Sequence, residues 1–376
     1  MEDPWARRAP RRRQPAPRFF WRSVGVVVAS ALVGAASASA VFLLRGDTAP
    51  LPSAVVELVE TQIITTEFSA APAAAVALKV LPSIVTVEIG IIDGADFIVT
   101  GSGSGVVIDV DGTLVTNEHV VGGAAAVRVV FADGRSYDAE VVGTDSLTDL
   151  AVITIDALGL TAIELGTSVD MAIGDPAIAI GSPLGLAGGP SVTVGVLSAF
   201  DRRVQVAGDV ELFGMLQTDA PITRGSSGGA LVDSKGRLIG ITSAIGVSDV
   251  GAEGLGFAIP VEMMTRITQD ILEFGGARHA FLGITGSTHF EIEIDGAVAP
   301  AGVAVASVIE DTAADAAGLL VGDIIESVDG QQVTTMNGLV VRLRFYRVGD
   351  VAKLQILRNG EIVLLDMELL ERPEGV

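Results

Sequence analysis

Between Ser83 and Ala258 the sequence alternates short apolar runs with dipeptides that favour tight turns. Asp111-Gly112, Asp133-Gly134 and Lys235-Gly236 each join two such runs. Because glycine adopts the left-handed backbone that short hairpin turns need, these dipeptides predict β-hairpins. Many short strands without a long helix predict a mainly β domain, either a barrel or a sandwich.

A helical pattern interrupts the β pattern after Pro260. Apolar residues then recur at helical spacing, namely Val261, Met264, Ile267, Ile271 and Leu272. Gly275-Gly276 is a typical end signal for such a helix. We therefore expect one domain over residues 74–275, beginning with a short helix over 74–82, and a second domain over residues 277–372.

The N-terminal segments predict a membrane anchor. Residues 1–22 are basic, polar and proline-containing, and are expected to form a disordered cytoplasmic tail. Residues 23–44 carry no charge and, at ~1.5 Å per residue, can cross a ~30 Å hydrocarbon core. The preceding arginines place the N-terminus inside. Ala38-Ser39-Ala40 suggests a cleaved signal peptide as the alternative, but apolar residues 41–44 favour an uncleaved helix, followed by a linker over 45–73.

Composition excludes several classes of site and partner. The chain has no cysteine, so disulfides and thiolate metal sites are excluded, and nothing in it implies another metal or a cofactor. Residues 1–45 hold eight arginines and two acids, whereas residues 46–376 hold 16 basic and 44 acidic groups. An acidic body of this kind argues against nucleic acid as a partner.

Three separated residues have the chemistry of a serine hydrolase. Ser227 lies in a glycine-rich stretch, where a tight turn can expose a nucleophilic hydroxyl, although a plain hairpin loop would have the same composition. His119 can act as the base and Asp149 can orient it, with Asp145 as a rival acid. The order His, Asp, Ser, with gaps of 30 and 78 residues, is that of chymotrypsin-like folds. The remaining histidines, His279 and His289, are expected to be solvated.

The motifs around these residues resemble those of a known protease family. TNEHVV, TDLAVI and GSSGGALV, with GSGSGVVI upstream and GLGFAIPV downstream, are similar to the HtrA/Deg serine proteases, and the resemblance runs from about Ala74 to Arg372. It implies a mainly β fold, a chymotrypsin-like double six-stranded β-barrel followed by a PDZ domain. It also implies the catalytic set His119, Asp149 and Ser227, with Asp149 preferred to Asp145.

The resemblance also implies the surrounding sites. Backbone N–H groups of Gly225 and Ser227 would form the oxyanion hole. A small apolar substrate pocket would be formed by Ile222, Gly256, Phe257 and Ala258. The sequence Phe281-Leu282-Gly283-Ile284 is similar to a PDZ carboxylate-binding loop, and the groove wall would come from Leu339, Val340 and Leu343.

These features predict a membrane-anchored, single-pass, extracytoplasmic serine endopeptidase. Its expected substrates are misfolded or damaged proteins, and its PDZ domain would bind peptide C-termini and regulate proteolysis. A homotrimer is the expectation that comes with the family. The alternative is a non-proteolytic chaperone or peptide-binding module on the same scaffold, but the complete set of His, Asp and Ser favours the protease.

Overall fold

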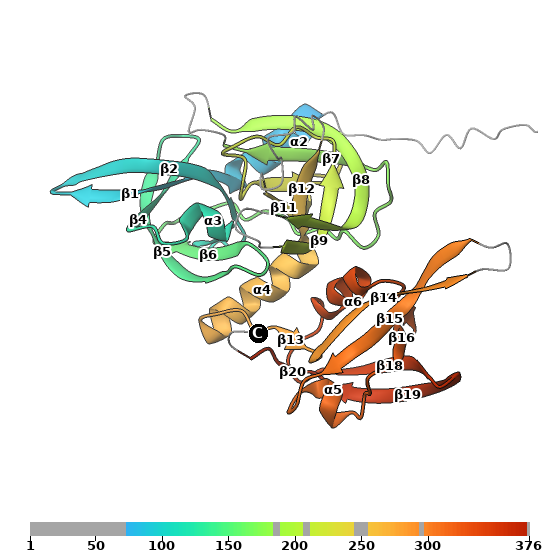
Figure 1. Ribbon diagram of the computed structural model, residues 1–376. Coiled ribbons are helices and arrows are strands. Elements are labelled where there is room, and N and C mark those ends of the chain that lie inside the picture. The colour runs from blue at the N-terminus through green and yellow to red at the C-terminus, as the bar shows by residue number, and fades with distance from the viewer. Residues whose placement is uncertain (1–72, 183–188, 206–210, 244–254, 293–296, 374–376) are drawn as a thin grey trace, which may run out of the picture. The chain divides into compact units, whose positions relative to one another are not determined.

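The computed structural model describes residues 73–182, 189–205, 211–243, 255–292 and 297–373 (Figure 1). All described residues belong to one unit, Glu67–Val376. The predicted cytoplasmic tail and transmembrane helix, and all but the last residue of the predicted linker, lie outside the described residues. No helix within the described residues is long and apolar enough to cross a membrane.

The first six strands close into a barrel in the order β1-β2-β3-β6-β5-β4. They are β1 (Ile84–Asp93), β2 (Asp96–Val107), β3 (Thr113–Thr116), β4 (Ala126–Phe131), β5 (Ser136–Asp145) and β6 (Leu150–Ile155), with the short helix α3 (Glu118–Val121) after β3. Gly112 and Gly134, at φ of 98° and 87°, make the predicted turns. Val87, Leu114 and Ile153 are fully buried in the barrel core, where each such side chain contributes about 1.5–3 kcal/mol.

A second barrel follows in the order β10-β11-β12-β9-β8-β7. Its strands are β7 (Pro176–Gly181), β8 (Ser191–Gln205), β9 (Glu211–Thr218), β10 (Ala230–Val232), β11 (Leu238–Ser243) and β12 (Gly256–Pro260). Gly236, at φ 72°, turns the chain between β10 and β11 as predicted. The expectation of a mainly β fold with two six-stranded barrels is therefore confirmed.

Helices flank the barrels at both ends of this region. The predicted first helix is α2 (Ala73–Val80), followed by the 3₁₀ turn η1 (Leu81–Ser83), and the helix after the barrels is α4 (Val261–Phe274). Gly275 ends α4 in the left-handed conformation at φ 78°, with its N–H donating to the Ile271 carbonyl. The predicted apolar face of α4 is buried except for Leu272, which is 50% exposed. Including Leu272 was wrong, because it directly follows Ile271 and lies about 100° around the helix from it.

The C-terminal part forms a separate sheet with its own core. Its strands run in the order β14-β15-β16-β18-β19, β17 pairs with β16, and β13 pairs with β20. The elements are β13 (Ala280–Phe281), β14 (Ile284–Ile292), β15 (Val298–Val308), α5 (Ala313–Ala316), β16 (Ile324–Val328), β17 (Gln331–Gln332), α6 (Met336–Leu343), β18 (Val351–Arg358), β19 (Glu361–Glu368) and β20 (Leu370–Glu371). Val303, Ile325, Leu339 and Ile356 are at most 1% exposed in this core.

Two turns shape the ends of elements in this sheet. Asn359 and Gly360, at φ of 54° and 83°, form a two-residue hairpin turn, since Arg358 and Glu361 pair directly. Thr312 precedes α5, but its hydroxyl donates to the Ile309 carbonyl at 2.6 Å and does not cap the helix. This hydroxyl therefore holds the loop before α5.

Candidate active site

His119 and Asp149 form a close, doubly hydrogen-bonded pair. His119 belongs to α3, and its Nδ1 lies 2.8 and 2.9 Å from the two carboxylate oxygens of Asp149. The His119 backbone N–H also donates to Asp149 Oδ1 at 3.1 Å. Asp149 is 4% exposed, whereas the His119 side chain is 32% exposed. Since an ionised carboxylate only accepts hydrogen bonds, it keeps the proton on Nδ1 and leaves Nε2 as the ring nitrogen that can take up a proton.

The backbone and side chain of Asp149 are held from both barrels. Its main chain adopts the left-handed conformation at φ 58°, which is uncommon for a residue other than glycine. Its carbonyl accepts from Asn117 Nδ2 at 2.8 Å and from the Glu118 N–H at 3.2 Å. Ser243 of β11 donates to Asp149 Oδ2 at 3.2 Å, although Ser243 lies in the other barrel. Sequence reasoning missed Asn117 and Ser243; Asn117, directly before the expected base, could have been noticed, whereas no local pattern identifies Ser243.

The loop that carries Ser227 is fixed by hydrogen bonds on both sides of the serine. The Ser226 N–H donates to the Thr223 carbonyl at 2.9 Å, and the Gly228 N–H donates to the Thr242 carbonyl at 2.8 Å. Gly228 has a φ of 83°, and a Cβ there would lie 2.1 Å from the Ser104 carbonyl oxygen. The turn therefore requires glycine at this position, both for its conformation and for the available space.

Ser104 of β2 joins the first barrel to this loop. Its N–H donates to the Ser227 carbonyl at 2.7 Å, and its hydroxyl donates to the Gly225 carbonyl at 2.7 Å. The Ser182 N–H in turn donates to the Ser104 hydroxyl at 2.7 Å. Gly225, at φ 88°, and Ser227, 5% exposed, the two residues assigned to the oxyanion hole, thus lie in one tightly held turn.

The residues predicted for the substrate pocket are only partly brought together. Ile222 and Ala258 belong to one buried apolar cluster. A Cβ on Gly256 would lie 2.8 Å from Ile222 Cδ1, so these two residues are also adjacent. Phe257 packs in a different core cluster, because successive residues of a strand point to opposite faces. The Phe257 side chain therefore does not lie with the other three.

Two acids and one histidine outside the pair have clear positions. The structure places Asp149, and not Asp145, against His119. Asp145 instead accepts from His279 Nε2 at 2.9 Å, and His279 is only 8% exposed. The expectation that His279 is solvated was therefore wrong, because it packs between separate segments of the fold. Asp219 accepts from the Val196 N–H at 2.7 Å and so has a structural role in the second barrel.

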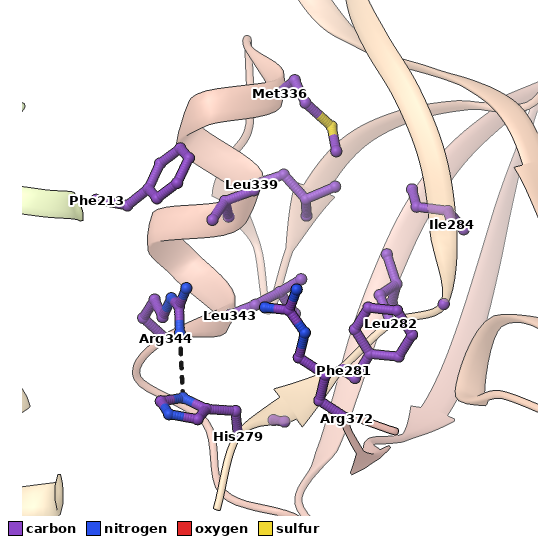
Figure 2. Close-up of a pocket in the computed structure, with 13 residues that line it drawn as sticks. Phe213, His279, Phe281, Leu282, Ile284, Met336, Leu339, Leu343, Arg344 and Arg372 are labelled. Atoms are coloured by element: carbon purple, nitrogen blue, oxygen red, sulfur yellow. Dashed lines mark hydrogen bonds between the residues drawn. The ribbon is translucent and has the colours of Figure 1, made fainter. Parts of the chain in front are cut away.

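The predicted PDZ residues line an apolar cavity of about 250 Å³ (Figure 2). Phe281, Leu282, Gly283 and Ile284 form one side, and Leu339, Val340 and Leu343 of α6 form the other. The structure therefore brings together every residue that the sequence assigned to the loop and the groove wall. Phe213 of β9, which sequence reasoning did not assign, also lines this cavity. In the described part of the chain no three or more His, Asp or Glu side chains are grouped to hold a metal ion.

Comparisons with known proteins agree with both parts of the fold. The sequence matches the family described as "Trypsin-like peptidase domain" over residues 103–241 and "PDZ domain" over residues 262–369. It is 41% identical over 278 residues to the periplasmic serine endoprotease DegP of Escherichia coli K12, covering 73% of this chain and 58% of DegP. It is 34% identical over 355 residues to the serine protease PepD of Mycobacterium tuberculosis, covering 89% of this chain and 73% of PepD.

Solved structures of HtrA-type proteases are similar to this chain as well. The HtrA-type protease AlgW, solved with a tripeptide, superposes with a TM-score of 0.64 and 35% sequence identity, covering 80% of this chain and 97% of AlgW. AlgW with a decapeptide gives a TM-score of 0.63 and 34% identity, with 80% and 99% coverage. The similarity thus extends through the barrels and the C-terminal sheet together.

Proposed function

Because this chain belongs to the HtrA family of serine proteases, we propose that it is a serine endopeptidase that cleaves misfolded or damaged proteins. The observation that carries the proposal is the His119–Asp149 pair, in which both carboxylate oxygens lie within 2.9 Å of Nδ1. That geometry fixes the imidazole in the form needed by a general base. The glycine-rich turn with Ser227, held by Ser104, supplies the nucleophile.

The proposed reaction follows from these contacts. Ser227 Oγ attacks the peptide carbonyl carbon while His119 Nε2 takes up the hydroxyl proton, which it then gives to the leaving amine. Asp149 stabilises the imidazolium formed in between. The N–H groups of Gly225 and Ser227 stabilise the negative oxygen, and each such donor typically lowers the barrier by about 3 kcal/mol. Water then releases the acylated fragment by the same steps.

We propose that substrates present a small aliphatic side chain to the pocket. The residue six positions before Ser227 is Pro221, which has no carboxylate to pair with a cationic side chain of the substrate. The proposed pocket instead has an apolar surface, which is supplied by Ile222, Gly256 and Ala258. Phe257 contributes only its backbone, because its side chain packs elsewhere. Valine or alanine would fit such a surface better than an aromatic residue.

We further propose that peptide C-termini bind the cavity beside α6 and regulate proteolysis. Extended peptides add to a PDZ sheet edge, with the carboxylate at the loop formed here by residues 281–284. AlgW, the similar protease, was solved with a tripeptide and with a decapeptide, which supports peptide binding here. Helix α6 also contacts the second barrel, since Asn337 Nδ2 of α6 donates to the carbonyl of Asp201 in β8 at 3.4 Å. Binding in the cavity can therefore act on the barrel that carries Ser227.

Cleavage of casein, an unfolded protein, tests this proposal. Residues 46–376 are expected to degrade casein, and a peptide with an apolar residue at its free C-terminus should increase the rate. The same peptide with an amidated C-terminus is the matched control and should have little effect. Absence of cleavage with every peptide would contradict the protease and favour the alternative, a non-proteolytic peptide-binding module.

We propose that residues 23–44 anchor the chain in the membrane with residues 46–376 outside the cytoplasm, and that the protease forms a homotrimer. Support for the location comes from DegP, which is named a periplasmic enzyme, and from the uncharged run itself. After alkaline carbonate extraction the full chain should stay with the membrane, and a chain lacking residues 1–45 should be released. Recovery of the full chain in the supernatant would contradict the anchor.

Sedimentation of residues 46–376 at three times the monomer mass would support the trimer.

A further inference from the structure

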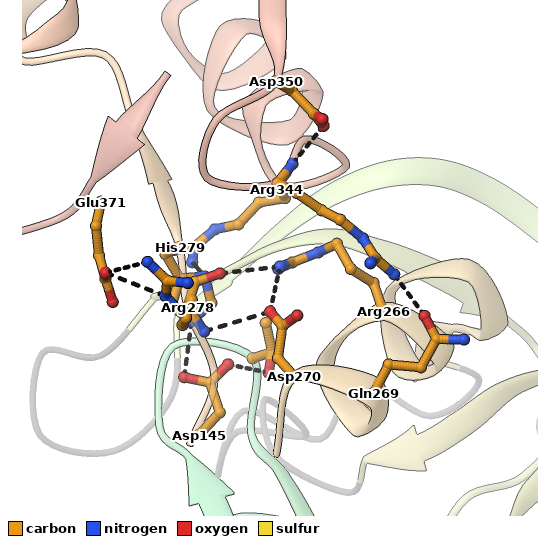
Figure 3. Close-up of polar contacts among 11 residues, drawn as sticks. Asp145, Arg266, Gln269, Asp270, Arg278, His279, Arg344, Asp350 and Glu371 are labelled. Carbon is orange, nitrogen blue, oxygen red and sulfur yellow. Dashed lines mark hydrogen bonds and ion pairs between the residues drawn. The ribbon is translucent and has the colours of Figure 1, made fainter. Parts of the chain in front are cut away.

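A buried polar cluster connects three separate segments of the structure (Figure 3). His279, in the linker after α4, places Nε2 2.9 Å from Asp145 Oδ1 and Nδ1 3.1 Å from Arg344 Nη1. Asp145 ends β5, and Arg344 directly follows α6. His279 and Asp145 are 8% and 7% exposed, and the proposed peptidase chemistry uses neither of them.

The neighbours of His279 fix where its proton lies. A guanidinium only donates hydrogen bonds, so Nδ1 must accept from Arg344. An ionised carboxylate only accepts, so Nε2–H must donate to Asp145. One uncharged tautomer satisfies both contacts. A second proton would place an N–H group on Nδ1 opposite the N–H of Arg344, so protonation keeps the contact with Asp145 and breaks the contact with Arg344.

Asp145 organises the turn that presents the proposed catalytic acid. Its Oδ1 accepts from the Leu147 N–H at 3.3 Å, and its Oδ2 accepts from the Thr148 hydroxyl. Asp149 follows immediately in the left-handed conformation. Burial would raise the pKa of Asp145, but hydrogen bonds from His279 and Thr148 and the charge of Arg344 hold that pKa below its usual value. The carboxylate is thus ionised and acts as the centre of the turn.

Arg344 connects the same histidine to the peptide groove. It follows the groove wall of α6 and lines the cavity that also contains residues 281–284 (Figure 2). Burial lowers the pKa of Arg344 to about 10, against the opposing effect of Asp145. The charge of this half-buried guanidinium is only partly compensated, so the carboxylate of a bound peptide would attract it.

The other charged groups around this cluster come from every neighbouring element. They are Arg266 and Asp270 of α4, Arg278 of the linker, Arg347 and Asp350 after α6, Glu371 of β20 and Arg372. Asp270 pairs with Arg266, and Glu371 pairs with Arg278. Asp145 is therefore the acid that directly contacts the imidazole of His279.

We propose that uncharged His279 is a positioning residue that couples the peptide groove to the turn carrying Asp149, and that its protonation uncouples them. The bridge Arg344–His279–Asp145 then transmits a displacement of α6 to the proposed catalytic acid. This inference rests on the proposed regulation by peptides. It predicts that peptide stimulation is large at neutral to alkaline pH and is lost in acid.

The test measures casein cleavage with and without the peptide at pH 8 and pH 5.5, which bracket the usual titration of histidine near pH 6.5. The ratio of the rates with and without peptide is the readout at each pH, because it cancels the effects of pH that are common to both rates. Stimulation on the order of tenfold at pH 8 is typical of such coupling, and we expect a ratio close to one at pH 5.5. His279→Gln keeps a donor and an acceptor but cannot be protonated, so its ratio should not change with pH.

His289→Gln is the matched control, since His289 lies in β14 and its side chain is 30% exposed. It should behave as the unmodified chain. Arg344→Met should lower the ratio at pH 8. A ratio independent of pH in the unmodified chain, or unchanged stimulation in Arg344→Met, would overturn the coupling and leave the protease intact.

A second measurement does not depend on peptide stimulation. NMR titration of the three histidines can be followed in the Ser227→Ala chain with and without Arg344→Met. Removing the adjacent cation should shift the pH dependence of the His279 signals and leave that of the His289 signals in place. No movement would show that the contact does not exist. If this shift is present but peptides never stimulate, the regulation proposed above fails and the bridge stands as a structural contact.

Discussion

Replacing Ser227 by alanine is expected to lower kcat for casein cleavage by a factor on the order of 10⁶. In the proposed reaction the Ser227 hydroxyl supplies the oxygen of the acyl bond, and the alanine side chain has no oxygen to replace it. Binding of substrate should persist, because the pocket and the N–H groups of the turn remain. Rates of peptide release measured under single-turnover conditions would show the loss in the chemical step.

The matched control for this change is Ser226→Ala. Ser226 precedes Ser227, and it is the Ser226 backbone that contacts Thr223 and Thr242. The activity of the Ser226→Ala variant should therefore stay within about tenfold of that of the unmodified chain, since the backbone contacts of residue 226 are unchanged. Both variants should have melting temperatures close to that of the unmodified chain, because each loses only one oxygen atom. Equal residual activity in the two variants would contradict the assignment of Ser227 as nucleophile.

Replacing Asp149 by asparagine is expected to reduce kcat by about 10⁴. The asparagine side chain has an N–H₂ group in place of one carboxylate oxygen, and both oxygens of Asp149 now face His119 Nδ1. A donor facing Nδ1 favours the proton on Nε2, which is the wrong tautomer for a general base. The loss should appear in kcat, while the KM for casein changes little.

Asp111→Asn is a suitable control for the charge itself. Asp111 is exposed in the turn before β3, and its replacement removes one negative charge without touching His119. Its activity should remain close to that of the unmodified chain. If Asp149→Asn retained more than a tenth of the activity, the tautomer argument would be wrong and another group would have to orient His119.

Local sequence patterns predicted much of the fold for clear physical reasons. Turn dipeptides and alternating apolar residues located the hairpins of both barrels, and a left-handed Gly275 ended α4 where expected. His119, Asp149 and the Ser227 turn could be predicted as a candidate site because each lies in a distinctive motif. These features depend on the conformational preferences of a few adjacent residues.

Contacts between distant segments could not be predicted in this way. Ser243 approaches Asp149 from 94 positions away, and His279 approaches Asp145 from 134 positions away. Neither residue has a local pattern that indicates its partner, and His279 was expected to be solvated. The Phe257 side chain packs apart from Ala258, because successive residues of a strand point to opposite faces.

The hydrogen bonds of Ser104 have a consequence for the biosynthesis of this protein. Ser104, in the first barrel, holds the turn of Ser227 in the second, and Ser243, in the second barrel, holds Asp149 in the first. The reactive geometry therefore exists only after both barrels have folded and docked. In a nascent or half-folded copy the proposed nucleophile and the proposed catalytic acid are therefore not yet held in place, so the order of folding itself delays the reactivity proposed for this site.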